Sequence, residues 1–553
     1  MMANLNTLEH LRAFLVHHLS AVHHVRLINV AYALGASYAL LKVIQVIRRR
    51  LKTTALRGPS SPSLLWGVSK VIFLSTDSGE VYEKWAEGYG GAYEIPWVLG
   101  NTRIVLCDPK AIAHLYGGEP WTYVQTPFSK IGTEGIVGKG SLLTARGEDH
   151  RRQRKTLTPA FNNAAIGNLI SVFYESAYKA KGGWDSLIEE HDDGDAVIEV
   201  QNWMNHISLE TIGIAGFSHH FGSLDGKKTL VEEAFNSIGS TNQTVDLFFV
   251  MLAQVFPWLL RLPIARSKHW QRLNDTMGEI SNAFLTKSRK EKEAGTLSES
   301  EEKSILGLLI KAEDQGGQRH LTREEVTAQA KTLLLAGYES TSISLTWALI
   351  ELSKNPDIQT KLRAELLEFG ADPTYDQLLN GLPYLDAVVH ETLRMHAPFS
   401  GFTRMAAVDD VIPLSKPVRT QSGKFVDHIS VTKGTYLSVS VPSINRSTAL
   451  WGPDAKEFNP ERWIREDGIP AAAKEIQGHR HLLTFLDGPR TCLGKGFAVT
   501  EFKIVLSVLV KHFMFELRDG PETVIEIVNG ILPRPKVAGE QGTAAPLRVR
   551  RFE

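Results

Sequence analysis

One cysteine stands in a frame that can present its sulfur for chemistry. Cys492 lies in the segment 485–494 (FLDGPRTCLG), and the stretch 493–513 that follows has helical apolar spacing. Gly488 and Gly494 allow positive φ or a close approach of the backbone to a flat group, and the proline after the first glycine stiffens the loop. Backbone N–H groups at the start of the following helix favour thiolate, the form that binds metals.

The second cysteine carries no such frame. Cys107 and Cys492 are the two cysteines in the chain, too few for a secreted disulfide scaffold or a four-thiolate zinc or iron–sulfur site. A lone cysteine usually packs as a small apolar side chain, and we expect this of Cys107. The low cysteine content indicates a reducing compartment.

An acid and a base lie three residues apart in the helical stretch 383–396 (PYLDAVVHETLRMH). Residues at i and i+3 share a helix face, so Glu391 and Arg394 can form one hydrogen-bonded pair. On spacing alone, a solvated surface ion pair is the alternative interpretation.

A long helix is expected to cross the fold. Thr322 and Glu325 form a capping box, and helical character continues until Asn355-Pro356, a span of about 48 Å at about 1.5 Å per residue. Its middle reads AGYEST at 336–341, where small residues leave room for a ligand and hydroxyls can bond back to carbonyls one turn earlier. A glycine-containing core helix is the alternative.

The elements around these motifs belong to one large domain. The chain has 553 residues, of which 43% are hydrophobic and 22% charged, with 61 basic and 61 acidic residues. This composition excludes a disordered chain, and zero net charge argues against nucleic-acid binding. Helical periodicity dominates, with β-like runs near 93–107 and 411–441. We therefore predict a mainly α fold with small β-sheets (α+β), in a single domain over residues 58–553.

The first fifty residues have a different character. After a flank, residues 1–26, the stretch 27–47 is apolar over a membrane-spanning length and ends at Arg48, Arg49, Arg50 and Lys52. Positive charge marks the cytosolic side, so we expect a single-pass anchor in the endoplasmic reticulum membrane with the following domain in the cytosol. A buried or interfacial helix is the alternative, because Lys42 interrupts the run. The histidines of the flank have no accompanying thiolate or carboxylate cluster, so no metal site is expected there.

From about Gly58 to the C-terminus, the sequence resembles the haem-thiolate monooxygenases of the cytochrome P450 family, whose motifs occur here in the family's order. The resemblance implies one P450-type domain that binds haem b. It implies that Cys492 is the axial ligand of the haem iron, where an anionic sulfur promotes O–O cleavage. It also implies that Arg490 pairs with a haem propionate and that Phe485 packs beside the sulfur; Gly494 completes the family frame.

The same resemblance assigns further residues around the haem. Glu391 and Arg394, with Arg462 of the segment 458–463 (FNPERW), match a structural triad that supports folding and haem retention. Arg154 and Arg404 match two propionate clamps, for which guanidinium groups are well suited. His150 stands where the family usually has tryptophan, which leaves that one contact open.

The central helix matches the family's oxygen groove, where an acid and an alcohol relay protons. Glu339 matches the acid. Ser340 stands where the family usually has threonine; it keeps the hydroxyl and loses the β-methyl that restricts its rotamer. Thr341 is the alternative relay. The predicted catalytic residues are thus Glu339, Ser340 and Thr341.

No dinucleotide fingerprint, phosphate loop, nucleophile elbow or His-Glu-x-x-His motif occurs in the sequence. Electrons must then come from a partner, and the resemblance implies NADPH–cytochrome P450 reductase, which supplies them from NADPH. A proximal basic surface is expected to dock an acidic flavin domain; its residues are Arg151, Arg152, Lys155 and Lys495. The other partners implied are O2, a membrane and a small-molecule substrate.

The substrate is expected to be apolar, since aromatic and aliphatic residues fill the segments that the resemblance places around the distal pocket: 121–143, the region of Phe217, and 399–402. The Leu486-Asp487 variant and the long insertion 416–433 resemble fungal members that tailor secondary metabolites. A terpenoid or polyketide intermediate is the expected substrate, with fatty acids or xenobiotics as alternatives. Two other functions stay open: a reductase-independent haem-thiolate isomerase or dehydratase, and a non-enzymatic haem carrier or sensor.

Overall fold

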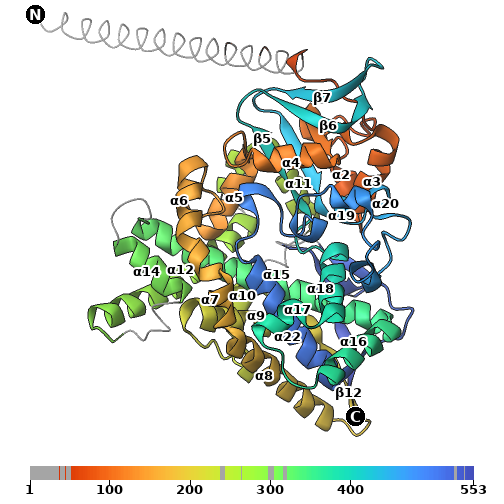
Figure 1. The fold of residues 1–553 in the computed structure, drawn as a ribbon. Coiled ribbons are helices and arrows are strands. Elements are labelled where there is room, and N and C mark those ends of the chain that lie inside the picture. Colours follow the sequence, from red (N-terminus) through yellow and green to blue (C-terminus); the bar gives the residue numbers. More distant parts are fainter. Residues whose placement is uncertain are drawn as a thin grey trace, which may run out of the picture.

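The computed structural model describes residues 37, 44, 51–236, 243–262, 265–296, 304–314, 320–528, 532–540 and 542–552. The predicted flank 1–26, and the predicted anchor 27–47 apart from Ser37 and Ile44, lie outside the described residues. Within them the chain is mainly helical with small sheets (Figure 1), which confirms the predicted fold class.

Helices form the bulk of the described chain. They are α2 (Ser69–Leu74), α3 (Ser78–Tyr89), α4 (Pro109–Gly117), α5 (Pro127–Val137), α6 (Gly147–Leu157), α7 (Asn163–Gly167), α8 (Ile170–Glu189), α9 (Val200–Phe217), α10 (Leu230–Asn236), α11 (Gln243–Val255), α12 (Ala265–Glu293), α14 (Ile305–Asp314), α15 (Arg323–Lys354), α16 (Pro356–Phe369), α17 (Tyr375–Asn380), α18 (Pro383–Met395), α19 (Val441–Asn445), α20 (Thr448–Trp451), α21 (Ala471–Lys474) and α22 (Lys495–His512).

Across the described ranges, the strands form four small sheets. The largest has the order β1-β2-β8-β5-β3, and the others pair β6 with β7, β10 with β11, and β4-β12-β9. Their bounds are β1 (Ala92–Pro96), β2 (Thr102–Leu106), β3 (Tyr123–Gln125), β4 (Asp195–Glu199), β5 (Gly401–Ala406), β6 (Asp410–Arg419), β7 (Phe425–Val431), β8 (Tyr436–Ser440), β9 (Phe513–Leu517), β10 (Ile525–Val528), β11 (Arg534–Val537) and β12 (Pro546–Arg551).

Helix α15 is the centre of the helical core. The predicted capping box is present: the Thr322 side chain accepts from the Glu325 N–H, and the Glu325 carboxylate accepts from the Thr322 N–H. The helix packs against α9, α12, α18 and α22 (Figure 1). Among the described residues it is the one helix long and apolar enough to cross a membrane, but most of it is buried inside the protein. It is therefore a core helix, and the helices around it pack against each other through it.

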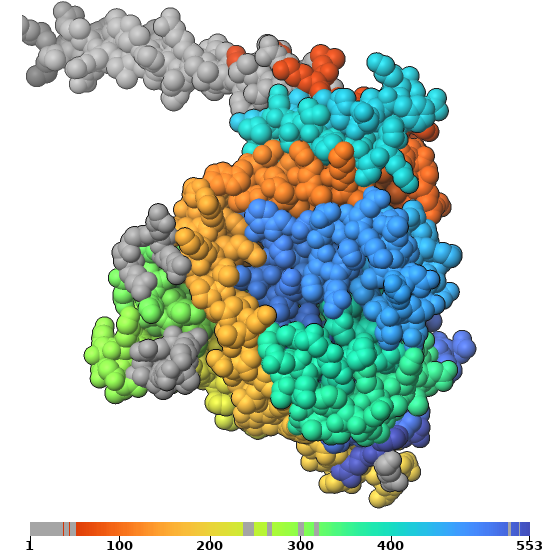
Figure 2. All heavy atoms as spheres, viewed as in Figure 1, coloured from red at the N-terminus to blue at the C-terminus, as the bar shows by residue number. Residues whose placement is uncertain are grey.

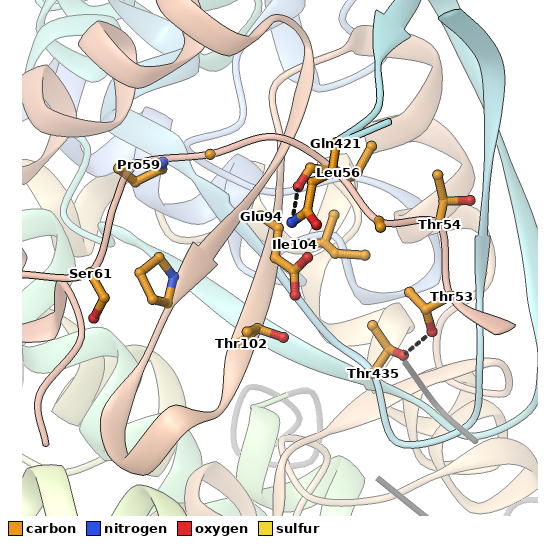
Figure 3. A pocket seen from close by; sticks show the side chains of 13 residues that line it. Thr53, Thr54, Leu56, Pro59, Ser61, Glu94, Thr102, Ile104, Gln421 and Thr435 are labelled. Atoms are coloured by element: carbon orange, nitrogen blue, oxygen red, sulfur yellow. Dashed lines mark hydrogen bonds between the residues drawn. The ribbon is translucent and has the colours of Figure 1, made fainter. Parts of the chain in front are cut away.

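The segment that enters the domain is tied to the β6–β7 hairpin. The Thr54 N–H donates to the Ser430 carbonyl at 2.9 Å, and Gln421 Nε2 donates to the Leu56 carbonyl at 3.0 Å (Figure 3). Leu56 is fully buried in the core under the sheet. A surface hollow of about 400 Å³ lies between this segment and strands β1 and β2. The segment that contains Thr54 and Leu56 is thus fixed against the β6–β7 hairpin.

Cys107 follows β2 and is half-buried. It packs at the edge of two apolar clusters. Burial raises the pKa of its thiol to about 12, so it stays protonated at neutral pH. This environment supports the packing role expected of it.

Candidate functional site

The loop before α22 presents Cys492. The Cys492 N–H donates to the Phe485 carbonyl at 2.8 Å, which closes the loop across the segment between them. Gly488 has φ +66°, and a Cβ there would lie 2.4 Å from the Tyr116 carbonyl oxygen. Glycine is therefore required at this position. Leu486 also adopts positive φ, which is uncommon for a residue with a side chain.

Gly494 does not adopt positive φ, one of the two roles expected of it. It is the N-cap of α22 with φ −84°, and a Cβ would meet only ordinary van der Waals contact with Phe161 at 3.7 Å. Positive φ is therefore not the reason for this glycine. Its backbone N–H instead interacts with the Cys492 sulfur.

The environment of Cys492 pulls the pKa of its thiol in two directions. Burial raises the pKa, while the Gly494 N–H, Arg154 and Lys495 act to lower it, and burial is the larger influence. The N–H groups thus act as predicted but do not by themselves make the thiolate dominant. The side chain nevertheless remains exposed. A bound metal cation would supply the missing stabilisation, because a coordinating thiol is deprotonated.

Three arginines lie around the loop, and two of them, Arg404 and Arg490, share the carboxylate of Glu119. Arg404 Nε donates to Glu119 Oε1 at 2.5 Å, and Arg490 Nε lies 3.4 Å from Glu119 Oε2. Arg154 Nη1 donates to the Thr491 carbonyl at 2.7 Å. The cluster therefore has more positive than negative charge. Sequence reasoning missed Glu119, which lies on no recognised motif.

His150 adds no charge to this cluster. It is buried on α6, and its pKa is lowered to about 3, first by burial and then by Arg490 and Arg154. The imidazole is therefore neutral at pH 7, so the excess positive charge comes from the arginines alone.

Glu391, Arg394 and Arg462 meet in the core behind the loop. Arg394 Nη2 and Nε donate to the two Glu391 oxygens at 2.8 and 2.9 Å, and Arg462 Nε donates to Glu391 Oε1 at 3.3 Å. All three side chains are fully or almost fully buried. Arg394 also donates to the Asn445 and Ala455 carbonyls. The cluster joins α18 to the 3₁₀ turn Pro460–Trp463 and to the chain before it.

Glu339 has a partner that the sequence did not reveal. Arg534 Nε, on β11, donates to Glu339 Oε1 at 2.6 Å. Burial raises the pKa of Glu339, and Arg534 acts in the opposite direction. Within the described residues, the second oxygen, Oε2, is buried without a hydrogen-bond partner. One carboxylate oxygen is thus fixed by Arg534, and the other can still accept a hydrogen bond.

Ser340 and Thr341 point to different surroundings. Ser340 Oγ donates to the Ala336 carbonyl at 2.8 Å on a partly exposed face of α15. Thr341 is buried, and its hydroxyl interacts with Glu501 of α22. Of the two hydroxyls, Ser340 lies on the same open face as Ala336 and Thr341 faces the core.

Glu501 is a buried acid that sequence reasoning missed. It is fully buried among Ser208 and Thr211 of α9 and Thr341 of α15, and its pKa is raised to about 8 by burial. Within the described residues, neither carboxylate oxygen has a well-formed hydrogen bond. The group is therefore largely neutral at pH 7.

The predicted basic surface is only partly available. Arg151 and Lys155 are exposed and Lys495 is half-buried, on segments that adjoin on the face shown in Figure 2. Arg152 differs: its guanidinium donates to Glu325 Oε1 at 2.6 Å, which links α6 to the start of α15. Arg152 is therefore part of the internal structure.

The segments expected around the substrate divide into two groups. Phe128, Phe399 and Phe402 line a pocket of about 300 Å³ beside the large sheet. Phe217 is instead buried against Phe284 of α12, with ring centroids 5.4 Å apart. Its region therefore contributes to the core at this position.

Comparison with known proteins agrees with this arrangement. The family model described as "Cytochrome P450" matches residues 59–537. Cytochrome P450 monooxygenase claQ of Ampulloclitocybe clavipes is 54% identical over 530 residues, covering 95% of this chain and 98% of that protein. Cytochrome P450 monooxygenase claW of the same fungus is 52% identical over 532 residues, with the same coverage. Cytochrome P450 monooxygenase 205 of Postia placenta is 34% identical over 549 residues, covering 96% and 99%.

Proposed function

Because the chain belongs to the cytochrome P450 family, an oxidoreductase family that binds haem, we propose that it is a monooxygenase that inserts one oxygen atom of O2 into an apolar small molecule. One observation carries this proposal: Cys492 is exposed in a loop whose Arg490 shares the Glu119 carboxylate with Arg404, and Arg154 acts on its thiol.

The donor set fits haem. Cys492 supplies a sulfur whose deprotonation a metal cation would favour. Arg154, Arg404 and Arg490 carry three positive charges against the one of Glu119, an excess suited to a group with two carboxylates. Cys492 would hold the iron, and the three arginines would hold the propionates. When bound, haem supplies the iron at which O2 is activated.

The residues of α15 would move the proton that this chemistry requires. Glu339 is held by Arg534 through one oxygen only, so the other is available to a hydroxyl or water. Ser340 lies on the more open face of the helix, whereas Thr341 faces Glu501. We therefore assign the relay to Glu339 and Ser340. Thr341 instead joins α15 to α22.

The family implies a redox partner, which we propose to be NADPH–cytochrome P450 reductase. Arg151, Lys155 and Lys495 supply positive charge for an acidic flavin domain. We further propose that residues 27–47 anchor the protein in the endoplasmic reticulum membrane with residues 58–553 in the cytosol. Deleting residues 1–50 tests the anchor: the remaining chain should bind haem and leave the membrane fraction in high salt or mild detergent.

For the substrate, we propose a terpenoid or polyketide intermediate of fungal secondary metabolism. The apolar pocket walls at Phe128, Phe399 and Phe402 support an apolar skeleton. A spin-state titration of the haem protein with a panel of such compounds tests this class against fatty acids and xenobiotics.

The reaction type is tested by measuring product with and without reductase. A monooxygenase requires reductase, NADPH and O2, and incorporates label from 18O2. Product formed without reductase would instead identify an isomerase or dehydratase. Haem binding without any turnover across the panel would favour a carrier or sensor.

A further inference from the structure

The pocket beside the large sheet contains one cationic side chain, that of Arg103. The pocket has a volume of about 300 Å³ and is bounded by β2, β5, the start of α5 and the end of α11. Six aromatic residues line it: Phe73, Trp97, Phe128, Phe399, Phe402 and Tyr436. One cation, Arg103, lines it, and no carboxylate does so among the described residues.

Arg103 is fixed in place by neutral groups. Its Nη1 donates to Thr403 Oγ1 at 3.1 Å, and its Nη2 donates to Gln254 Oε1. The guanidinium carbon lies 3.6 Å from the centroid of the Trp97 ring, and Trp97 Nε1 donates to the same Gln254 oxygen at 2.8 Å. The aromatic ring and two neutral oxygens thus preorganise the guanidinium fork.

The charge of Arg103 is not neutralised by the protein around it. Burial lowers its pKa to about 10, and the groups that act in the opposite direction are two tyrosines, Tyr82 and Tyr436. Neither of these groups is a carboxylate. Within the described part of the chain, no carboxylate lies within ion-pair distance of this guanidinium. A partly buried cation without an anion is costly unless an anion binds to it.

The pocket adjoins the candidate haem-binding residues along β5. Thr403, which holds Arg103, is followed in β5 by Arg404, the candidate propionate clamp. Phe402 contacts the Arg404 guanidinium at 4.1 Å from its ring centroid and also lines the pocket. A ligand anchored at Arg103 would therefore lie against Phe402, which also contacts this clamp.

We propose that this pocket binds the carboxylate of an amphipathic substrate, with Arg103 as its anion-binding group and the aromatic wall around its apolar chain. The proposal rests on the monooxygenase function above and narrows its substrate class to carboxylic acids with an apolar body. A single guanidinium matches one negative charge and offers a planar fork for a carboxylate. Diphosphates carry more charge than one cation neutralises.

Ligand binding to the full-length, haem-loaded enzyme tests the proposal. The probes are dodecanoic acid, methyl dodecanoate and dodecyl phosphate, each titrated at pH 7.5 by the optical spin-state change and by calorimetry, with acids of eight to sixteen carbons as a length series. We expect the acid to bind at least about tenfold more tightly than its methyl ester, as for a charge-assisted pair. Arg103→Gln should remove this preference, and Arg103→Lys should keep part of it.

Arg57→Gln is the matched control. Arg57 also lies over an aromatic ring, Tyr89, at 5.7 Å, but it is exposed and outside the pocket. It should keep the full preference for the acid.

Three outcomes overturn the proposal: equal affinity for acid and ester across the length series, a preference that survives Arg103→Gln, or tighter binding of the phosphate than of the acid. These are distinguishable from failure of the proposed function. If the parent enzyme has the thiolate–haem spectrum but no preference for the acid, only the carboxylate site is contradicted. If the parent enzyme lacks that spectrum, the monooxygenase assignment is contradicted.

Discussion

Arg534 of the C-terminal hairpin donates to Glu339 in the middle of α15, although the two residues are 195 positions apart in the chain. The contact leaves the second Glu339 oxygen buried and unpaired within the described residues. Arg534 therefore counteracts the effect of burial on the pKa of the acid that we assign to the relay.

Replacing Arg534 should shift the pH dependence of coupling. Arg534 acts to lower the pKa of Glu339, so in Arg534→Gln the pKa rises further and less carboxylate is present at a given pH. A relay group must accept a proton before passing one on. The rising limb of product formed per NADPH oxidised should move to higher pH by roughly one unit or more.

Arg548→Gln is the control for this shift. Arg548 pairs with Asp195 at 3.1 Å in another part of the C-terminal sheets. The pH dependence of coupling in Arg548→Gln should match that of the parent. If Arg534→Gln shows the same pH dependence as Arg548→Gln, Arg534 has no role in proton delivery.

Ser340 and Thr341 should differ in their effect on coupling. Ser340→Ala should keep consuming NADPH but release hydrogen peroxide in place of product, because the hydroxyl on the open face is lost. General acid–base assistance of this kind is worth about 100- to 10,000-fold. Ser340→Thr should couple at least as well as the parent. Thr341→Ala should stay coupled; the reverse pattern would assign the relay to Thr341.

Cys492→Ala should lose the red-shifted absorption of the reduced, carbon-monoxide-bound protein that marks thiolate ligation. Cys107→Ala is the matched control and should keep it, because its thiol is protonated and packed between apolar clusters. Retention of the band in Cys492→Ala would contradict the ligand assignment.

Glu391→Gln should destabilise the domain and weaken haem retention. It leaves two buried guanidinium groups, Arg394 and Arg462, without their shared anion. Breaking a buried pair in this way typically costs about 3–5 kcal/mol. The thermal midpoint and the haem content after gel filtration measure the effect.

Glu461→Gln is its comparison, since Glu461 forms a half-exposed ion pair with Lys361 close by. Loss of such a pair is worth about 1 kcal/mol or less. Equal losses in the two variants would mean that the buried cluster has no special structural weight.

Glu501 makes the stability of the fold depend on pH in a defined direction. Its pKa is about 8 in the fold and about 4.5 in an ordinary environment, so between these pH values the folded chain holds a proton that the unfolded chain has released. Stability should therefore fall as pH rises from about 4.5 to about 8. At about 1.4 kcal/mol per pKa unit, the full loss amounts to a few kcal/mol.

Glu501→Gln should remove this dependence. Its thermal midpoint relative to the parent should rise between pH 5 and pH 8.5, whereas that of the exposed Glu190→Gln should not. A constant difference across this range would show that Glu501 does not titrate in the fold.

Local sequence motifs predicted those contacts of the site that join residues close together in the sequence. The capping box at Thr322 and Glu325 and the pair Glu391–Arg394 follow from spacing of three residues on one helix, and both occur as expected. Arg462 required the family resemblance, because it reaches Glu391 from 71 positions away.

The missed partners share one physical property. Glu119, Arg534 and Glu501 act across contacts between segments that are distant in the chain, and no local pattern indicates which helix or strand will face them. The ion pair of Arg152 was missed for the same reason, since its partner Glu325 lies at the start of another helix. For Gly494 the structure excludes positive φ, one of the two expected roles, and leaves the close approach of a flat group as a prediction.

The carboxylate of Glu325 does more than cap its helix. It accepts Arg152 Nη2 at 2.6 Å, Arg152 Nη1 at 3.1 Å and Gln153 Nε2 at 2.9 Å, all from α6. Hydrogen bonds to a charged group are worth about 1.5–3 kcal/mol each, so α15 cannot tilt at this end without carrying α6 or losing them. Because Arg154 follows directly in α6 and donates to the Thr491 carbonyl, the start of α15 is linked through α6 to the loop that presents Cys492.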